Sequence, residues 1–169
     1  MPCPVRILIR PLGLTATTTP GTDPSIPGPP AHGYSAFGTA TPLDVTQLNP
    51  SVLDASGSII STAHDLGRFY SALLSGRLLA PAQLDATKTT VPAPQLGADY
   101  GLGLGELPLS CGGSCFAHPG GVPGYRTWVG ATPDGTRTAV VFATDDGDEN
   151  TQQAMSTLVD RELCRDKVR

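Results

Sequence analysis

The sequence predicts an α+β fold, an antiparallel β-sheet with flanking helices. Three observations predict it. Apolar residues recur at helical spacing over residues 62–75, strand-like segments separated by turns follow between residues 114 and 144, and a second helical pattern closes the chain at residues 150–164. Helices, then strands, then a helix is the order of an α+β layer.

Composition narrows the class of protein. A length of 169 residues fits one domain, and a net charge of -4 without a Lys/Arg cluster argues against a nucleic-acid partner. No run of 18 apolar residues is present, so no membrane span is expected. Residues 1–10 are too short and too broken by proline for a signal peptide.

Residues 15–54 are predicted to form a Pro/Gly-rich irregular arm. Five prolines fall between residues 20 and 30, and proline removes a backbone donor that a helix or a central strand needs. Two interpretations stay open: a linker or disordered tail, or a long loop pinned against a larger body. Apolar residues within the arm, such as Ile26 and Phe37, favour the second.

Two helices are expected after the arm. The first spans residues 62–75, because Thr62 followed by Asp65 resembles a capping box and Gly76 supplies a C-cap. Pro81 at a first-turn position opens a second, shorter helix that runs to about Thr89.

The strands follow. Residues 100–105 alternate large and small side chains, which predicts a strand with a glycine-lined face that a bulky neighbour can approach. Further strands are expected at 114–118, 125–131 and 137–144, and the segment 132–136 between the last two is typical of a hairpin turn.

The four cysteines are Cys3, Cys111, Cys115 and Cys164. An even count fits disulfides in an exported protein and thiols or a metal in a cytosolic one, and three pairings stay open. Cys111, Cys115 and Cys164 could bind zinc together with His118, but the spacing is loose, and we expect neither a metal nor a cofactor.

An acidic cluster precedes the closing helix and consists of Asp145, Asp146, Asp148 and Glu149. It lacks the ligand spacing of a calcium loop. We interpret it as negative charge that meets the positive end of the helix dipole.

One histidine stands out. His32 and His64 are predicted to be solvent-exposed or to cap, whereas His118 ends a predicted strand and precedes Pro119, Gly120 and Gly121. A glycine-rich turn there could present backbone N–H groups to a substrate carbonyl. The alternative is an ordinary tight turn between strands.

A nucleophile motif is absent from the sequence. The chain has no G-x-S-x-G elbow. Asp85 and Cys164 stand three residues before the two lysines, which excludes Ser-x-x-Lys, and neither asparagine lies two residues after a tyrosine or serine. The sequence therefore contains none of these motifs for a catalytic serine and its partners.

Five segments occur in a specific order: Arg10–Thr15 (RPLGLT), Ala55–Leu66 (ASGSIISTAHDL), Tyr100–Leu104 (YGLGL), His118–Gly120 (HPG) and Gly121–Tyr125 (GVPGY). This set, over about residues 8–165, resembles the C-terminal half of the class C-like penicillin-recognising serine hydrolases, the family of serine β-lactamases and D-Ala-D-Ala carboxypeptidases. The His118 triad resembles the family's third signature motif.

The resemblance implies a partial β-lactamase/transpeptidase-like fold. Residues 1–14 would end a helical subdomain that is otherwise missing, 15–54 form the arm, and 55–169 form the C-terminal part of the domain. Because Ser-x-x-Lys and Tyr-x-Asn belong upstream in this family, the resemblance also implies a truncated gene product or an internal start.

The family reaction is acyl transfer through an acyl-enzyme on D-Ala-D-Ala-type peptides or β-lactams. By resemblance, His118, Pro119, Gly120 and Gly121 bind the substrate: His118 shapes the pocket wall and helps to orient the substrate carboxylate, and the Gly121 N–H forms half of an oxyanion hole. Pro119 departs from the usual residue and lacks its hydroxyl and N–H, and Gly105 stands where some members carry an arginine.

We expect the chain to be inactive alone, with the missing N-terminal half of the enzyme as its partner and a small peptide or β-lactam as substrate. A non-catalytic ligand-binding module or pseudoenzyme of the same family is the alternative. The secreted carboxypeptidases in the family imply a Cys111–Cys164 disulfide and a location outside the cell or at the cell envelope.

Overall fold

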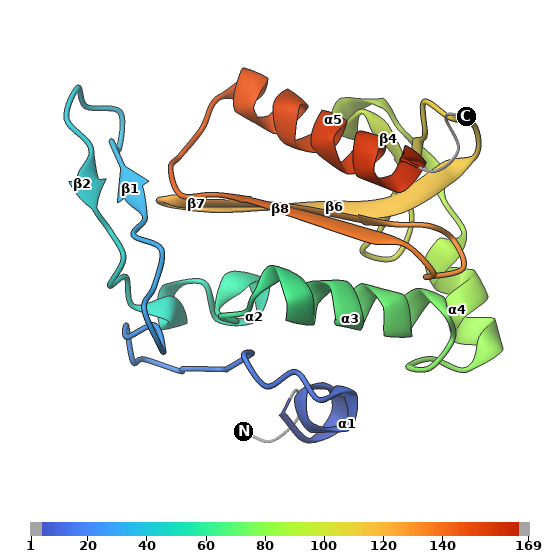
Figure 1. Cartoon of the computed structure of the whole chain (residues 1–169), viewed down its shortest axis with the longest axis horizontal. Helices are drawn as coiled ribbons and strands as arrows, with labels where there is room; N and C mark the ends of the chain where they lie inside the picture. The colour runs from blue at the N-terminus through green and yellow to red at the C-terminus, as the bar shows by residue number, and fades with distance from the viewer. Residues whose placement is uncertain (1–4, 166–169) are drawn as a thin grey trace.

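The computed structural model describes residues 5–165; the ends of the chain, which include Cys3, lie outside this range. It confirms the α+β class, with helices on both sides of an antiparallel sheet (Figure 1). The elements are a π-helical turn η1 (Val5–Ile9), α1 (Arg10–Leu12), β1 (Tyr34–Ser35), β2 (Leu43–Asp44), a 3₁₀ turn η2 (Pro50–Val52), α2 (Asp54–Gly57), α3 (Ala63–Leu74), α4 (Pro81–Lys88), β3 (Val91–Ala93), a 3₁₀ turn η3 (Pro94–Leu96), β4 (Ala98–Tyr100), β5 (Gly105–Pro108), β6 (Ser114–Val122), β7 (Tyr125–Ala131), β8 (Thr138–Ala143) and α5 (Glu149–Cys164).

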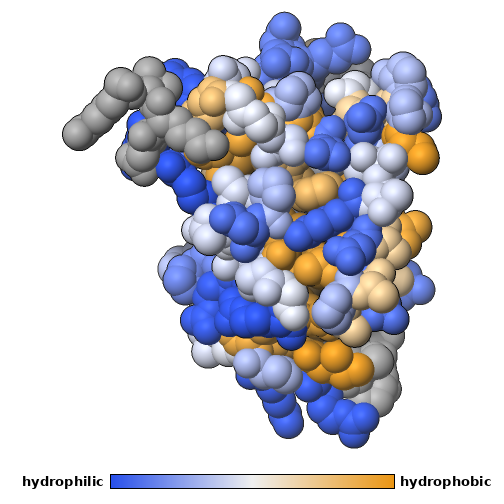
Figure 2. All heavy atoms as spheres, turned by 90° about the vertical axis from the view of Figure 1, so that its right-hand side faces the viewer, coloured by the Kyte–Doolittle hydropathy of each residue, from blue (hydrophilic) through white to orange (hydrophobic). Residues whose placement is uncertain are grey.

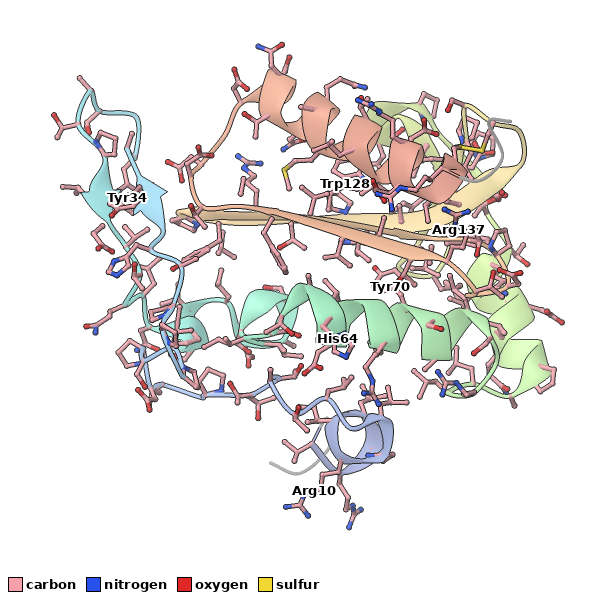
Figure 3. The ribbon with its side chains drawn as sticks, viewed as in Figure 1. Arg10, Tyr34, His64, Tyr70, Trp128 and Arg137 are labelled. Carbon is pink, nitrogen blue, oxygen red and sulfur yellow. A yellow bond between two sulfur atoms is a disulfide. The ribbon has the colours of Figure 1, made fainter. Side chains whose placement is uncertain are left out.

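The main sheet has six strands in the order β3-β4-β5-β6-β7-β8, each antiparallel to the next. Side chains alternate between its two faces. One side, the α5 face, packs against α5 and buries Ala117, Val159 and Leu163. The other, the α3 face, packs against α3 and buries Phe116 and Val129, among others. In Figure 3, Trp128 lies on the α5 face and Tyr70 lies between α3 and the sheet.

The α3 helix begins as its sequence predicts, but one contact differs. The Thr62 hydroxyl caps it by accepting the Asp65 N–H at 3.3 Å. The Asp65 carboxylate does not complete a capping box. It is 2 % exposed and accepts hydrogen bonds from the Ala16 N–H at 2.9 Å and the Thr17 hydroxyl at 2.8 Å. Asp65 therefore fastens the start of the arm to the helix.

The strand predicted over residues 100–105 is wrong. Tyr100 ends β4 and Gly105 begins β5, and the residues between them form a turn closed by the Gly101 N–H and the Leu104 carbonyl at 2.8 Å. Gly103 has a φ of 83°, a value that favours glycine. The glycines that suggested a strand face thus serve a hairpin.

The turn predicted directly after His118 is also wrong. β6 continues through Pro119, Gly120 and Gly121 to Val122 and pairs with β7 along this whole stretch. The reversal comes at residues 123–124, where Gly124 has a φ of 78°. Glycine weakens a strand, but pairing with β7 on one side is enough to keep this segment extended.

The two edges of the sheet differ. β3 is three residues long and contains Pro92, which cannot donate to a further strand. At the other edge, β8 is six residues long and carries no charged residue and no proline. No strand within residues 5–165 pairs with its outer side.

Figure 2 views the molecule from the end at which α4 lies and shows polar residues over much of that surface, with apolar residues visible between them. None of the helices within residues 5–165 has the length and apolar character to cross a bilayer.

Candidate functional site

A groove of about 580 Å³ lies on the α3 face, where the sheet extends beyond the first turn of α3. Three parts of the chain form it. The sheet contributes His118, Gly120 and Phe142, α3 contributes Leu66 and Tyr70, and the remaining wall comes from the arm and from residues 53–61. The walls are mainly apolar, and the arm contributes Pro24, Ile26, Ala31, Val45, Thr46, Leu48, Asn49 and Pro50.

The sequence-predicted residues His118, Pro119, Gly120 and Gly121 lie together at one wall of this groove, and all four are exposed. They are brought together because they are consecutive residues of β6. β5 begins only at Gly105, whose partner is Ala117, so β6 has a neighbour only on its β7 side from His118 onward.

The open side of β6 exposes specific backbone groups. At the β5–β6 turn, the Leu109 N–H donates to the Gly113 carbonyl at 3.0 Å. Hydrogen bonds alternate along antiparallel strands, so from this pair onward the odd-numbered residues of β6 direct their backbone groups toward the β5 side. By this alternation the Pro119 carbonyl and the Gly121 N–H face the open edge. They can pair with an extended ligand laid beside β6.

Tyr70 is a groove residue that the sequence suggested only as part of the apolar stripe of α3. It is 6 % exposed and lines the groove with His118. Burial raises the pKa of its phenol, with a smaller contribution from Tyr100. The phenol therefore stays protonated at neutral pH, as a hydrogen-bond donor.

Asp146 holds the arm against the sheet. Its carboxylate accepts the Ser35 hydroxyl at 2.7 Å and the Ala36 N–H at 3.0 Å from the arm, and the Gly124 N–H at 3.0 Å from the β6–β7 turn. Its own carbonyl accepts from Arg126 Nε. The Gly124 N–H and then the Ser35 hydroxyl lower the pKa of Asp146. The helix-dipole interpretation does not describe this residue, whereas Asp148 does cap α5.

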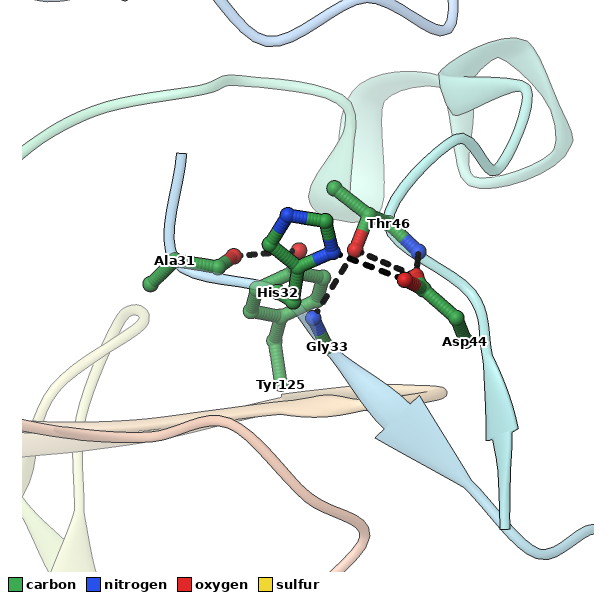
Figure 4. A network of polar contacts seen from close by, with 6 residues as sticks. All are labelled: Ala31, His32, Gly33, Asp44, Thr46 and Tyr125. Carbon is green, nitrogen blue, oxygen red and sulfur yellow. Dashed lines mark hydrogen bonds and ion pairs between the residues drawn. The ribbon is translucent and has the colours of Figure 1, made fainter. Parts of the chain in front are cut away.

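A second set of contacts pins the arm above Tyr125 (Figure 4). The Tyr125 hydroxyl donates to the Ala31 carbonyl at 2.9 Å, and a Cβ at Gly33 would clash with the Tyr125 ring. His32 contacts Asp44 at 2.7 Å, and hydrogen bonds from Thr46, followed by His32, lower the pKa of Asp44 to about 2. The arm is therefore a pinned loop, the second of the two interpretations.

The cysteines lie away from the groove. Cys111 and Cys164 form a disulfide between the β5–β6 turn and the end of α5. This pairing uses two of the four residues considered as zinc ligands, and the other two, Cys115 and His118, lie on opposite faces of β6. Burial raises the pKa of the free Cys115 thiol to about 11, so it is an unreactive part of the core.

The roles of two residues were missed by sequence reasoning. Tyr70 follows the helical period of a core residue, and nothing in its spacing signals a groove. Asp146 was seen only within an acidic cluster, and its partners Ser35 and Ala36 are more than a hundred residues away. A long-range contact of this kind leaves no local signal.

The family model described as Beta-lactamase matches residues 6–162, which covers nearly all of the described chain.

Solved structures give a consistent result. The D-stereospecific amidohydrolase from Streptomyces sp. is 37% identical over 95% of this chain and 47% of its own, with a TM-score of 0.86. The D-amino acid amidase from Ochrobactrum anthropi SV3, complexed with D-phenylalanine, is 26% identical over 98% of this chain and 51% of its own, with a TM-score of 0.76. A penicillin binding protein from Bacillus halodurans shares the fold at 18% identity and a TM-score of 0.65. The chain spans about half the length of these proteins.

Proposed function

The chain belongs to the beta-lactamase family, and on this premise we propose that it is the C-terminal part of a serine hydrolase that works through an acyl-enzyme. In this proposal residues 1–14 end a helical subdomain, residues 15–54 are an arm along the groove, and residues 55–169 contribute one wall of the active site. The observation that carries the proposal is the open edge of β6 beside the groove, where the Gly121 N–H is free to bind a developing oxyanion.

The chemistry needs a second segment. A serine hydroxyl from a Ser-x-x-Lys motif attacks the carbonyl carbon of the substrate, the leaving group departs with a proton, and water then hydrolyses the ester. This chain contains neither that motif nor Tyr-x-Asn. We therefore expect it to supply His118, Pro119, Gly120 and Gly121 to a site whose nucleophile lies on the other half of the enzyme.

Two uncovered surfaces support a partner segment. β8 presents six residues of unpaired edge within the described part of the chain, and the apolar groove runs beside the proposed site. A partner that pairs with β8 and packs into the groove would bury both surfaces. The solved relatives have about twice the length of this chain, which is room for such a segment.

The proposed substrates are small amide-bonded compounds. D-Ala-D-Ala-type peptides and β-lactams follow from the resemblance, so carboxypeptidase activity is one form of the proposal. The amidohydrolase and amidase names of the relatives favour amides of D-amino acids as well. A secreted or cell-envelope location belongs to the same proposal, and the Cys111–Cys164 disulfide is compatible with it.

Fragment complementation tests the proposal. The chain alone should hydrolyse neither nitrocefin nor a D-amino acid amide above buffer. Mixed or co-expressed with the part of the Streptomyces amidohydrolase outside the matched region, it should yield amide hydrolysis. A partner fragment whose proposed nucleophilic serine is changed to alanine is the control. Turnover by the chain alone, or none in the complex, contradicts the proposal.

The Gly121 N–H can be tested within that complex. Gly121→Pro removes the N–H, while Gly121→Ala keeps it, and a Cβ there meets only ordinary contacts, the nearest being Arg126 Nη1 at 3.5 Å. Loss of one oxyanion donor costs about 100- to 1000-fold in kcat. We expect that loss for Gly121→Pro and near-normal turnover for Gly121→Ala.

A second candidate function is a non-catalytic ligand-binding module, which the mainly apolar groove favours. Calorimetry with a D-phenylalanine amide on the isolated chain separates the two. Tight binding to the chain alone favours the module, whereas binding that appears only in the complemented enzyme favours the hydrolase.

A further inference from the structure

The ring of His118 stands at the point where β6 loses its neighbour. Its side chain is exposed, and the pairing of β6 with β5 stops one residue earlier, at Ala117 and its partner Gly105, the first residue of β5. The imidazole contacts the aromatic ring of Tyr100. The two ring centroids are 6.3 Å apart and the ring planes are inclined by 59°. This distance lies within the range in which aromatic rings attract each other.

Tyr100 is the better anchored member of this pair. It is half-buried at the end of β4 and is paired on both sides, with Val91 of β3 and Gly105 of β5. Its backbone is therefore held by two strands, whereas the His118 side chain projects from the free part of β6. The Tyr100 ring therefore occupies space that some of the staggered rotamers of the exposed His118 ring would need.

Gly105 makes the contact possible. A Cβ on Gly105 would lie 3.5 Å from Cδ2 of Tyr100 and 3.6 Å from Cβ of Ala98. These are ordinary contact distances, so alanine fits there. A longer side chain has to occupy space beside the Tyr100 ring, which lies next to the bare backbone of Gly105.

We propose that Tyr100 is a positioning residue that sets the orientation of the His118 ring at the edge of the groove, and that the missing side chain of Gly105 leaves the space for it to do so. The structural part of this inference needs only the geometry of the three residues. Its functional part, that the oriented ring faces a substrate, rests on the proposed function. The Tyr100 ring then decides whether the His118 imidazole keeps one orientation at the edge of the groove or samples several.

Nuclear magnetic resonance of the isolated chain tests the structural part. The carbon-bound ring protons of His118 should show a ring-current shift in the wild type and in Tyr100→Phe. Tyr100→Leu should move them to the positions of a mobile, exposed histidine. Unchanged His118 shifts in Tyr100→Leu would overturn the inference. The signals of His32, which lies in the arm, serve as the internal control.

Gly105 provides a second route that leaves Tyr100 in place. Gly105→Ala should keep the His118 shifts, and Gly105→Leu should move them in the same way as Tyr100→Leu. Equal spectra for both glycine variants contradict the role given to Gly105. Thermal unfolding and the Trp128 fluorescence of each variant report whether the sheet is intact, so a folding defect is recognised separately.

The complemented enzyme tests the functional part. Misplacement of a substrate-facing group by about an ångström costs up to about 100-fold in rate. We expect a loss of about tenfold or more in kcat/KM for Tyr100→Leu, with Tyr100→Phe close to wild type. An inactive wild-type complex contradicts the proposed function, and the His118 spectra of the isolated chain then decide the role of Tyr100 by themselves. Full activity in Tyr100→Leu together with unchanged spectra overturns the present inference alone.

Discussion

The two faces of strands β6, β7 and β8 differ in how completely they are buried. On the α5 face, Ala117, Val159 and Leu163 are nearly inaccessible, and a disulfide closes one end of the layer. On the α3 face, the half near Leu74 and Ala131 is equally closed, but the half near His118 and Phe142 opens into the groove. Strands β6 to β8 therefore carry stability on one side and, in our proposal, substrate binding on part of the other.

This contrast assigns different consequences to similar substitutions. A change on the α5 face should lower the free energy of unfolding and leave the groove intact. A change at the open part of the α3 face should alter binding or activity and leave the free energy of unfolding nearly unchanged.

Removal of the disulfide should have the largest effect on stability. Cys111 and Cys164 are separated by 53 residues in sequence, and closing a loop of that length contributes about 4 kcal/mol in the chain-entropy model. The double variant Cys111→Ser/Cys164→Ser should lose most of this amount in urea unfolding. Reductant should destabilise the wild type by a similar amount and should not affect the variant; an equal response of both contradicts the prediction.

Leu163→Ala should cost about 3 kcal/mol, because Leu163 is 1% exposed and its loss leaves a cavity beneath α5. Phe142→Ala is the matched change on the groove side. Phe142 is 45% exposed, so its loss should cost less than about 1 kcal/mol. Urea unfolding of both variants checks the difference. Similar costs for the two would remove the contrast between the faces.

A pair of glycines on neighbouring strands sharpens the comparison. A Cβ at Gly130 would lie 2.6 Å from Cγ1 of Val159, whereas a Cβ at Gly120 would meet Thr127 at 3.6 Å. Gly130→Ala should therefore destabilise by about 2 kcal/mol through overpacking, and Gly120→Ala should be nearly neutral. Adding Val159→Ala should recover part of the loss in Gly130→Ala. If the two substitutions instead lower the free energy of unfolding additively, the clash between Gly130→Ala and Val159 is not the cause.

The smallest expected effect is the pH dependence of the hydrogen bonds by which Asp146 holds the arm. Hydrogen bonds lower the pKa of Asp146 below 3.8, so its contribution to stability is present above that pH and is lost as the pH falls through the lowered value. The amide proton shifts of Gly124 and Ala36 should follow this titration, with a midpoint below 3.8. In Asp146→Asn the shifts should not titrate there. A midpoint at or above the ordinary value contradicts the assignment.

Local patterns in the sequence were enough to predict much of the fold. The capped helix α3, the proline-initiated α4, the β7–β8 hairpin and the closing helix α5 all follow from residue spacing and turn chemistry close to each element. The family resemblance predicted the fold family, which the family match and the solved structures bear out.

The errors have a common physical cause. Residues 100–105 and residues 119–122 are both rich in glycine, and glycine permits a turn or a strand equally. Which one forms is decided by the partner strand: β7 keeps the second segment extended, whereas the first has to reverse between β4 and β5. The attachment of the arm could not be predicted for a related reason, because Asp65 and Asp146 bind groups that are distant in sequence.

The edge of β8 also governs how the chain behaves in solution. It offers six consecutive uncharged residues, of which Thr138, Val140, Val141 and Phe142 have high β-propensity, and this composition favours aggregation. The isoelectric point is about 5.2, so electrostatic repulsion between copies vanishes close to that pH. Purified alone near pH 5, the chain should assemble edge to edge into sheet-rich aggregates, and Phe142→Lys, at an exposed position of β8, should suppress this.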